Sequence, residues 1–285
     1  MPEGDTVHLA ASKLDRALGG HKLTKSDVRV PRYALTDLSG SLVKEVVARG
    51  KHLMIRVEGD TTLHTHFGMD GSWWIGRLGA GWGGPVHQTR VILEAGDVVA
   101  RGFSLASIDV VDTSTEDALV GHLGPDLLGP DWDARAARAN IESHPARAIA
   151  DVLLDQTVLA GIGNVFACEI CFLRGLHPMT PVADVSEVDR LVSLAKRLLE
   201  ANRGLGRQVT TGDLRRGRGR WVYGRHEQPC LRCGERILKE GPSRARARVT
   251  YWCPRCQPAY TGRAFQSVPA AGGRDDGGAD VRAGA

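Results

Sequence analysis

The chain opens with apolar residues at helical spacing. Within residues 5–18 an apolar stripe recurs at positions three and four apart, formed by Val7, Ala10, Ala11, Leu14 and Leu18. This spacing predicts an amphipathic helix, because residues three and four apart share one helical face. Asp5 precedes the stripe and is a preferred N-cap residue, so we expect the helix to begin there.

Residues 42–111 change to the shorter period of strands. Runs rich in β-branched and apolar residues, separated by turns that contain Gly and Asp, are typical of short strands. The predicted strands are residues 42–48, 51–57, 61–67, 89–93, 98–101 and 107–111. Short strands without helices between them predict a β-sandwich or flattened barrel for this part of the chain.

Helical spacing returns from about residue 114. Asn164 is an expected N-cap, Gly175 an expected helix stop, and residues 186–189 (Ser-Glu-Val-Asp) resemble a capping box. The predicted helices are residues 131–142, 145–154, 165–173 and 186–202. Strands followed by helices predict an α+β protein with more than one domain.

Length and charge narrow the class of protein. With 285 residues, 42% hydrophobic and 25% charged, the chain is long enough for two or more domains with their own cores. The first predicted helix begins with acidic residues and no long apolar run follows it. We therefore expect neither a signal peptide nor a membrane span, and a cytoplasmic protein.

The positive charge is concentrated in one region. The formal net charge is only +4, but arginines crowd residues 203–255. Such an excess predicts a face that binds a polyanion, with a merely solvated surface as the alternative. Residues 203–225 combine arginines and glycines with few apolar residues, which predicts a flexible basic loop that forms no core but can follow a phosphate backbone.

Six cysteines in a reducing compartment indicate metal binding rather than disulfides. Four of them form two Cys-x-x-Cys pairs, Cys230 with Cys233 and Cys253 with Cys256. Four thiolates are the ligand set of a closed, structural zinc site, so we predict one zinc ion here. The remaining pair, at helical spacing among apolar residues, is interpreted as packed core thiols, with a metal or redox pair as the alternative. These two are Cys168 and Cys171.

The N-terminus offers the strongest candidate nucleophile. Removal of Met1 would leave Pro2 with a free secondary amine beside Glu3. An N-terminal amine has an ordinary pKa of roughly 7.7 to 8, so a sizeable fraction is unprotonated near neutral pH. The positive end of the following helix further disfavours the charged amine. The alternative is an ordinary translation start with no chemical role.

Three other positions are unusual for the elements that hold them. Lys51 has the strand parity of the apolar residues 53, 55 and 57, so it either reaches solvent at the sheet edge or faces a cleft. His64 and His66 share one strand face and are a weak candidate metal pair, because no third ligand is near in the sequence. Met69 lies in a glycine-flanked turn, where an exposed methionine can serve as an apolar wedge.

A glycine-bearing turn, residues 161–164 (Gly-Ile-Gly-Asn), joins two predicted helices. Free N–H groups at a helix N-terminus favour a phosphate, and glycines let that phosphate approach the backbone. Many antiparallel helix pairs are joined in the same way, so the turn alone does not decide between phosphate binding and simple connection.

Five short motifs, in this order, resemble the Fpg/Nei family of DNA glycosylase/AP lyases over residues 1 to about 260. Each is weak alone, but the five together are highly specific. The resemblance implies an N-terminal β-sandwich, a helix-two-turn-helix domain and a zinc finger, with DNA in the cleft between them. The motifs are residues 2–5 (Pro-Glu-Gly-Asp), 49–53 (Arg-Gly-Lys-His-Leu), 66–69 (His-Phe-Gly-Met), 161–164 (Gly-Ile-Gly-Asn) and 248–257 (Arg-Val-Thr-Tyr-Trp-Cys-Pro-Arg-Cys-Gln).

The domain limits follow from the resemblance and the patterns together. We predict a catalytic β-sandwich domain over residues 1–113 and a helix-two-turn-helix DNA-binding domain over residues 114–225. A zinc finger is predicted over residues 226–260. Residues 261–285 are rich in Gly, Ala, Asp and Arg with little apolar content, which predicts a disordered tail.

The resemblance also implies the chemistry. Pro2 is the implied nucleophile that forms a Schiff base with the sugar of a damaged nucleotide, and Glu3 is the implied proton donor. Lys51 joins the catalytic set near the lesion phosphates. The implied activity is base excision repair, in which an oxidised base is removed and the strand is cut by β- and often δ-elimination.

The remaining motif residues are implied to hold the DNA. The resemblance assigns His66 to the lesion phosphates, Asn164 and Arg248 to the backbone, and Met69 to the gap left by the extruded base. Base extrusion is required because the reacting sugar of a stacked nucleotide is out of reach.

Two departures from the formamidopyrimidine branch favour the endonuclease VIII branch, which removes oxidised pyrimidines. After Met1 the chain begins Pro-Glu-Gly-Asp-Thr, where the formamidopyrimidine branch usually has Pro-Glu-Leu-Pro-Glu. That branch also carries an Arg-Arg-Phe-Gly wedge, and the most similar segment here is Arg-Gly-Phe-Ser (residues 101–104). Whether Arg101 or Phe103 enters DNA stays open. The alternatives are an oxidised-purine glycosylase of the same fold and a non-catalytic zinc-ribbon nucleic-acid-binding protein. We expect damaged DNA as the partner, no membrane, and a cytoplasmic, nucleoid-associated monomer.

Overall fold

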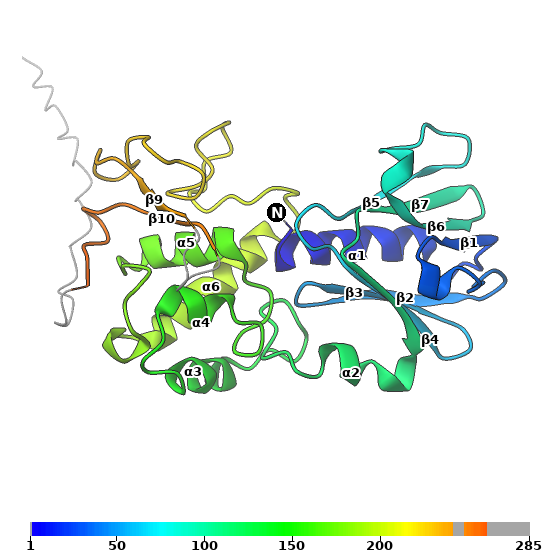
Figure 1. Cartoon of the computed structure of the whole chain (residues 1–285), viewed down its shortest axis with the longest axis horizontal. Helices are drawn as coiled ribbons and strands as arrows, with labels where there is room; N and C mark the ends of the chain where they lie inside the picture. The colour runs from blue at the N-terminus through cyan, green and yellow to red at the C-terminus, as the bar shows by residue number, and fades with distance from the viewer. Residues whose placement is uncertain (1, 242–247, 261–285) are drawn as a thin grey trace, which may run out of the picture.

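The computed structural model describes residues 2–241 and 248–260. Helix α1 (Gly4–Leu18) packs against strands of two separate sheets, as Figure 1 shows, and buries the predicted apolar stripe. Its N-cap is Glu3, with extended backbone, and Asp5 lies inside the first turn and is only 2% exposed. The prediction of Asp5 as N-cap is therefore wrong, because its side chain turns inward and bonds Gln208 instead.

Two four-stranded antiparallel sheets form the sandwich predicted for the first part of the chain. One has the order β1 (Lys25–Val28), β6 (Thr89–Ala95), β7 (Val98–Phe103), β5 (Ser72–Arg77). The other has the order β2 (Val43–Arg49), β3 (His52–Val57), β4 (Thr61–His66), β8 (Ser107–Asp112). Strands β1 and β5 are additional to the six predicted.

In the described part of the chain five helices follow α1, all within residues 117–202, a region called the helical half below (Figure 1). Short 3-10 turns at Pro31–Tyr33, Val86–Gln88, Thr113–Thr115 and Val182–Asp184 lie between the main elements. The apolar faces of the helices that follow α2 meet in one core that is separate from the sandwich core. The five helices are α2 (Asp117–Val120), α3 (Ala134–Glu142), α4 (Ile149–Leu154), α5 (Asn164–Leu173) and α6 (Val188–Asn202).

Two predicted helix caps are wrong. The N-cap of α5 is Gly163, and Asn164 is the first helical residue, with its side chain used elsewhere. The N-cap of α6 is Glu187 in a left-handed conformation at φ 60°, without a side-chain cap, so the predicted capping box at residues 186–189 does not form. The stop at Gly175 is consistent with its positive φ of 67°.

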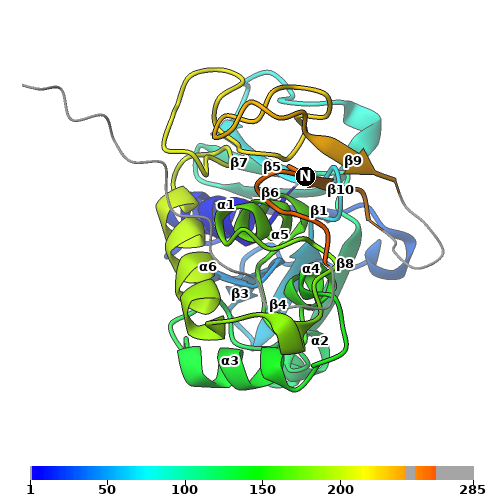
Figure 2. The same ribbon diagram turned by 90° about the vertical axis from the view of Figure 1, so that its left-hand side faces the viewer.

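The C-terminal part of the described chain is a small hairpin of β9 (Leu238–Glu240) and β10 (Thr250–Trp252), antiparallel to each other. Figure 2 shows it above the end of α5. Cys168 and Phe172 of α5 pack against its cysteines and Ile237. Cys168 is thus a core thiol as predicted, and burial raises its pKa well above the ordinary value. Arg244 and Arg246, which belong to the arginine-rich region of residues 203–255, and the predicted tail at residues 261–285 lie outside the described residues.

Residues 203–225 contain neither helix nor strand, but the prediction that they form no core is wrong. Val222 is fully buried, and backbone N–H groups of Trp221, Val222 and Tyr223 donate to the Glu169 carboxylate at 2.7 to 2.8 Å. Glu169 also accepts from the Thr210 hydroxyl. This buried carboxylate on α5 ties the segment to the helical core. Within the described ranges, every helix is too short or too polar to cross a bilayer.

Candidate active site

The N-terminus is bound to the helical half of the molecule through its backbone. The Gly4 N–H donates to the Gly161 carbonyl at 2.8 Å. A Cβ on Gly4 would lie 2.9 Å from the Gly161 Cα, so glycine is required for this approach. This contact holds the start of α1, and with it Pro2, against the turn at residues 161–164, and Figure 1 marks the N-terminus between α1 and α5.

Glu3 is fully buried against the first turn of α5. Its carboxylate oxygens accept backbone N–H bonds from Gly163 at 2.7 Å, Val165 at 2.7 Å and Phe166 at 3.3 Å. Burial raises the pKa of this carboxyl to about 7, against the opposing effects of the Lys51 charge and the amides. Near neutral pH the group is therefore divided between acid and carboxylate, the range in which a proton donor works best.

Lys51 follows a turn that is held against the helical half. Gly50, at φ 56°, donates its N–H to the Asp126 carboxylate at 2.8 Å. Burial lowers the pKa of Lys51 to about 8, while Glu3 raises it and Arg248 lowers it. Lys51 is therefore partly buried and close enough to Glu3 and Arg248 for their charges to act on it, rather than standing in open solvent at the sheet edge.

Asn164 and the segment after Arg248 meet directly. The Asn164 amide donates to the Val249 carbonyl at 2.7 Å. Arg248 is exposed, and its Nη1 lies 4.0 Å from the Sδ of Met69. Met69 is 62% exposed in the turn after β4. The structure thus brings residues from the sandwich, the helical half and the hairpin to one place.

A group of imidazoles that the sequence analysis did not predict lies beside Lys51. The Nδ1 of His52 lies 2.8 Å from the Nε2 of His64, and the Nδ1 of His64 lies 3.2 Å from the Asp109 carboxylate. The ring of His66 meets that of His52 edge-on at 4.9 Å. Burial, then the neighbouring imidazoles, lowers the pKa of His52 to about 3. Pairing of His52 with His66 and of His64 with Asp109 in the sheet produces this group.

The proton positions in this group follow from its acceptors. A carboxylate accepts only, so Asp109 places the His64 proton on Nδ1, and His52 then donates from its own Nδ1. His66 accepts the Gly68 N–H at its Nδ1, 3.1 Å away. A neutral His66 therefore carries its proton on Nε2, ready to donate to an anion.

Four cysteines converge as predicted. The sulfurs of Cys230, Cys233, Cys253 and Cys256 all lie within 4.8 Å of one another, which fits four ligands around one tetrahedral zinc. Residues 2–241 and 248–260 contain no second group of three or more possible ligands so arranged, so His64 and His66 are not part of such a site. When bound, zinc supplies folding energy to this hairpin rather than reaction chemistry.

Arg101 and Phe103, whose entry into DNA the sequence left open, are both buried. The Arg101 guanidinium lies over Trp74 at 5.1 Å and over Trp82 at 4.4 Å, and is 7% exposed. Phe103 is 4% exposed beneath Gly84. Neither side chain protrudes from the sandwich, in contrast to Met69.

Comparison with known proteins agrees with this arrangement. Residues 1–124 match the formamidopyrimidine-DNA glycosylase N-terminal domain, residues 123–211 its H2TH domain, and residues 227–259 the zinc finger found in FPG and IleRS. A probable endonuclease 8 2 of Streptomyces coelicolor is 53% identical over 262 residues, covering 90% of this chain and 94% of that protein. The chain belongs to the Fpg/Nei family.

Other members of the Fpg/Nei family are similar over almost their whole length. The DNA-(apurinic or apyrimidinic site) lyase Nei2 of Mycolicibacterium smegmatis is 48% identical, covering 91% of this chain and 100% of that protein. A formamidopyrimidine-DNA glycosylase of Gluconobacter oxydans is 32% identical. The Lactococcus lactis formamidopyrimidine-DNA glycosylase, solved with DNA containing an AP site, has a TM-score of 0.75 at 23% identity, covering 90% of this chain and 100% of that one. The predicted fold, with sandwich, helix-two-turn-helix domain and zinc finger, is thereby confirmed.

Proposed function

We propose that this protein is a bifunctional DNA glycosylase/AP lyase of base excision repair that removes oxidised pyrimidines. One observation carries the proposal: the N-terminal Pro2-Glu3 segment is held against the turn at residues 161–164, and the charge of the partly buried Lys51 acts on Glu3. A purely binding protein has no need to bury a carboxyl with a pKa of about 7 beside its N-terminus. The names of its close relatives, endonuclease 8 and AP lyase, support the same function.

The chemistry is derived from these residues. After removal of Met1, the Pro2 nitrogen attacks C1′ of the damaged nucleotide, and the bond from C1′ to the base breaks with the electron pair leaving on the base. Glu3 supplies a proton as the sugar ring opens, and an iminium between Pro2 and C1′ results. Loss of the C2′ proton expels the 3′ phosphate, and a further elimination expels the 5′ phosphate.

The DNA contacts proposed for this reaction come from all three parts of the fold. Lys51 and the Nε2–H of His66 would meet the phosphates at the lesion, and Asn164 and Arg248 the backbone beside it. Met69 would fill the gap of the extruded base, because it is exposed and apolar and its sulfur lies 4.0 Å from the Arg248 guanidinium.

Three finer predictions belong to the same proposal. We propose domain limits at residues 113, 225 and 260, and a monomer that binds damaged DNA. We also propose a cytoplasmic, nucleoid-associated protein, because its substrate would be the chromosome.

The test is cleavage of a panel of oligonucleotides that each contain one lesion. Oxidised pyrimidines should be excised and the strands that contained them cut. Oxidised purines should be excised more slowly. Preference for formamidopyrimidines or oxidised guanine would favour the oxidised-purine alternative. Binding of every duplex without cleavage of any, including one with an abasic site, would contradict the enzyme and favour the zinc-ribbon binding protein.

A further inference from the structure

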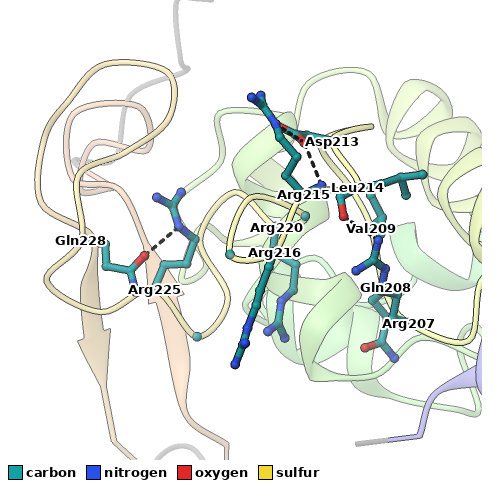
Figure 3. A pocket seen from close by; sticks show the side chains of 13 residues that line it. Arg207, Gln208, Val209, Asp213, Leu214, Arg215, Arg216, Arg220, Arg225 and Gln228 are labelled. Carbon is teal, nitrogen blue, oxygen red and sulfur yellow. Dashed lines mark hydrogen bonds and ion pairs between the residues drawn. The ribbon is translucent and has the colours of Figure 1, made fainter.

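A hollow lined by arginines lies between the helical half and the zinc hairpin, in the segment that follows α6. Its volume is about 290 Å³, and Figure 3 shows Arg216 and Arg220 at its centre, between Arg225 on one side and Arg207 on the other. Gln208, which also lines the hollow, bonds the Asp5 side chain on α1. The hollow therefore lies close to the N-terminus without including any residue proposed for catalysis.

The positive charge of this hollow is only partly neutralised. Asp213, the one acidic residue in its lining, is already paired with Arg215 at 2.7 Å and with Arg218 at 3.0 Å. Within the described part of the chain, Arg216 has no ion pair, and Arg220 has none either but lies over the Tyr223 ring at 5.3 Å. Two guanidinium groups are thus left for an outside partner.

Arg225 adds a buried cation to the wall. It is only 7% exposed, and its hydrogen bonds go to neutral acceptors: the Gln228 side chain at 3.2 Å and the carbonyls of Trp221 and Pro229 at 3.0 Å. Cys230 and Glu169 act on it through space, but neither forms an ion pair with it. Buried charges in proteins are usually paired directly, so this wall favours an anion in the hollow.

The fixed shape of the hollow indicates how its arginines bind. Glu169 fixes residues 221–223 by three backbone hydrogen bonds, and Asn202 fixes Val209 by two. Figure 3 shows the side chains of Arg216 and Arg220 extending in the same direction from this frame, away from those of Arg215 and Arg225. Two guanidinium groups that share a direction and form no ion pair within the described residues match a phosphate that carries more than one charge.

We propose that this hollow binds a terminal phosphate monoester, the group left at the ends of a cut DNA strand. A terminal phosphate is largely dianionic at neutral pH, whereas each phosphate inside a strand carries a single charge. The choice of a cut strand as its source rests on the proposed lyase function, since β- and δ-elimination leave phosphates on both sides of the gap. The hollow would then hold the product end after chemistry and slow its release.

The experiment compares DNA with and without terminal phosphates. Duplexes with a one-nucleotide gap are prepared with phosphate or hydroxyl groups at the gap, and their binding is followed by fluorescence anisotropy. Wild-type protein should bind the phosphate-ended duplex roughly tenfold more tightly, the effect of about one charge-assisted contact. The double variant Arg216→Ala/Arg220→Ala should bind both duplexes equally. The matched control Arg135→Ala, an exposed arginine on α3, should keep the wild-type preference.

Three results would overturn the proposal: equal binding of both duplexes by wild type, a preference that survives in the double variant, or its loss in Arg135→Ala. Inorganic tripolyphosphate serves as competitor. If phosphate-ended DNA displaces bound tripolyphosphate and hydroxyl-ended DNA does not, the ligand of the hollow is the phosphate at a strand end. If the protein binds tripolyphosphate but shows no preference between the two DNAs, the ligand is free polyphosphate and the proposal is overturned. Because the gapped DNA is made in advance, absence of cleavage would count against the proposed function and not against this site.

Discussion

The Glu3 carboxylate accepts the Gly163 N–H at 2.7 Å, across 160 residues of sequence, and leaves no room for a side chain between them. A Cβ on residue 163 would lie 2.5 Å from the Glu3 carboxyl carbon. Glycine at this position is therefore a requirement of the active site and not only of the turn.

Gly163→Ala should displace Glu3 and lower the single-turnover rate of base excision by at least about tenfold, because small misplacements of catalytic groups are costly. The melting temperature should also fall, since Glu3 is fully buried and has nowhere to move. The matched control is Gly204→Ala, where an added Cβ meets nothing within 4 Å. Equal rates for the two variants would show that Glu3 does not need this contact.

The pH dependence of base excision should carry the titration of Glu3. Because its pKa is about 7, the protonated form of Glu3 is lost as pH rises through neutrality. The rate of base excision should therefore decline above about pH 7. Glu3→Gln should lower excision by about 10²- to 10⁴-fold and remove this decline. An unchanged pH profile in Glu3→Gln would assign the titrating group elsewhere.

That variant needs a folding control. Both Glu3 oxygens accept backbone N–H groups, and the Gln amide can replace only one of them. A loss of roughly 1 to 3 kcal/mol of stability is therefore expected for the unpaired amide. Single-turnover rates are compared at a temperature where circular dichroism shows both proteins folded.

Met69→Ala tests the wedge. Excision and binding on a damaged duplex should weaken far more than cleavage of an abasic site in single-stranded DNA, because only the duplex leaves a stacking gap to fill. Leu35, which is 99% exposed elsewhere on the sandwich, supplies a control variant Leu35→Ala that should act on both substrates as wild type does. Equal losses on duplex and single strand would remove this role.

The imidazole group predicts sensitivity to acid. His52 has a folded pKa of about 3 against an ordinary value of 6.5, so the unfolded chain binds the extra proton between these values. Stability from this residue is complete above about pH 6.5 and is lost as pH falls toward 3, at up to about 1.4 kcal/mol per pH unit. The contribution of Glu3 to stability changes with pH in the opposite direction. Because its pKa is raised in the folded state, Glu3 favours the folded state at lower pH.

His52→Gln keeps a donor toward His64 but cannot titrate. Its melting temperature should therefore fall less than that of wild type between pH 7 and pH 5, whereas the exposed control His87→Gln should follow wild type. Parallel curves for His52→Gln and wild type would show that the imidazole group does not govern acid stability.

The sequence predicted what depends on local pattern or on short motifs. The stripe of α1, six strands and the four zinc ligands follow from periodicity and spacing, and the family motifs named Glu3, Lys51 and Asn164. The N-cap role predicted for Asn164 was wrong. An asparagine at the start of a helix usually caps it, but here the Asn164 side chain donates a hydrogen bond to the Val249 carbonyl.

What the sequence did not predict depends on partners far apart along the chain. His52, His64 and Asp109 meet only through the register of β3, β4 and β8, which no local pattern reveals. Glu169 lies in an apolar helical run, and its partners are more than 40 residues later. A charged residue inside such a run was the available signal, since a buried carboxylate requires donors.

Covalent trapping at Pro2 tests the central claim most directly. Borohydride added during turnover should reduce the iminium to a stable tertiary amine, so the protein should become fixed to DNA that contains a lesion, and peptide mass mapping should place the link on Pro2. A variant with one extra residue in front of Pro2 has an amide at that nitrogen and should bind damaged DNA but give no trapped complex. Trapping that persists in this variant, or a link mapped to Lys51, would contradict the account.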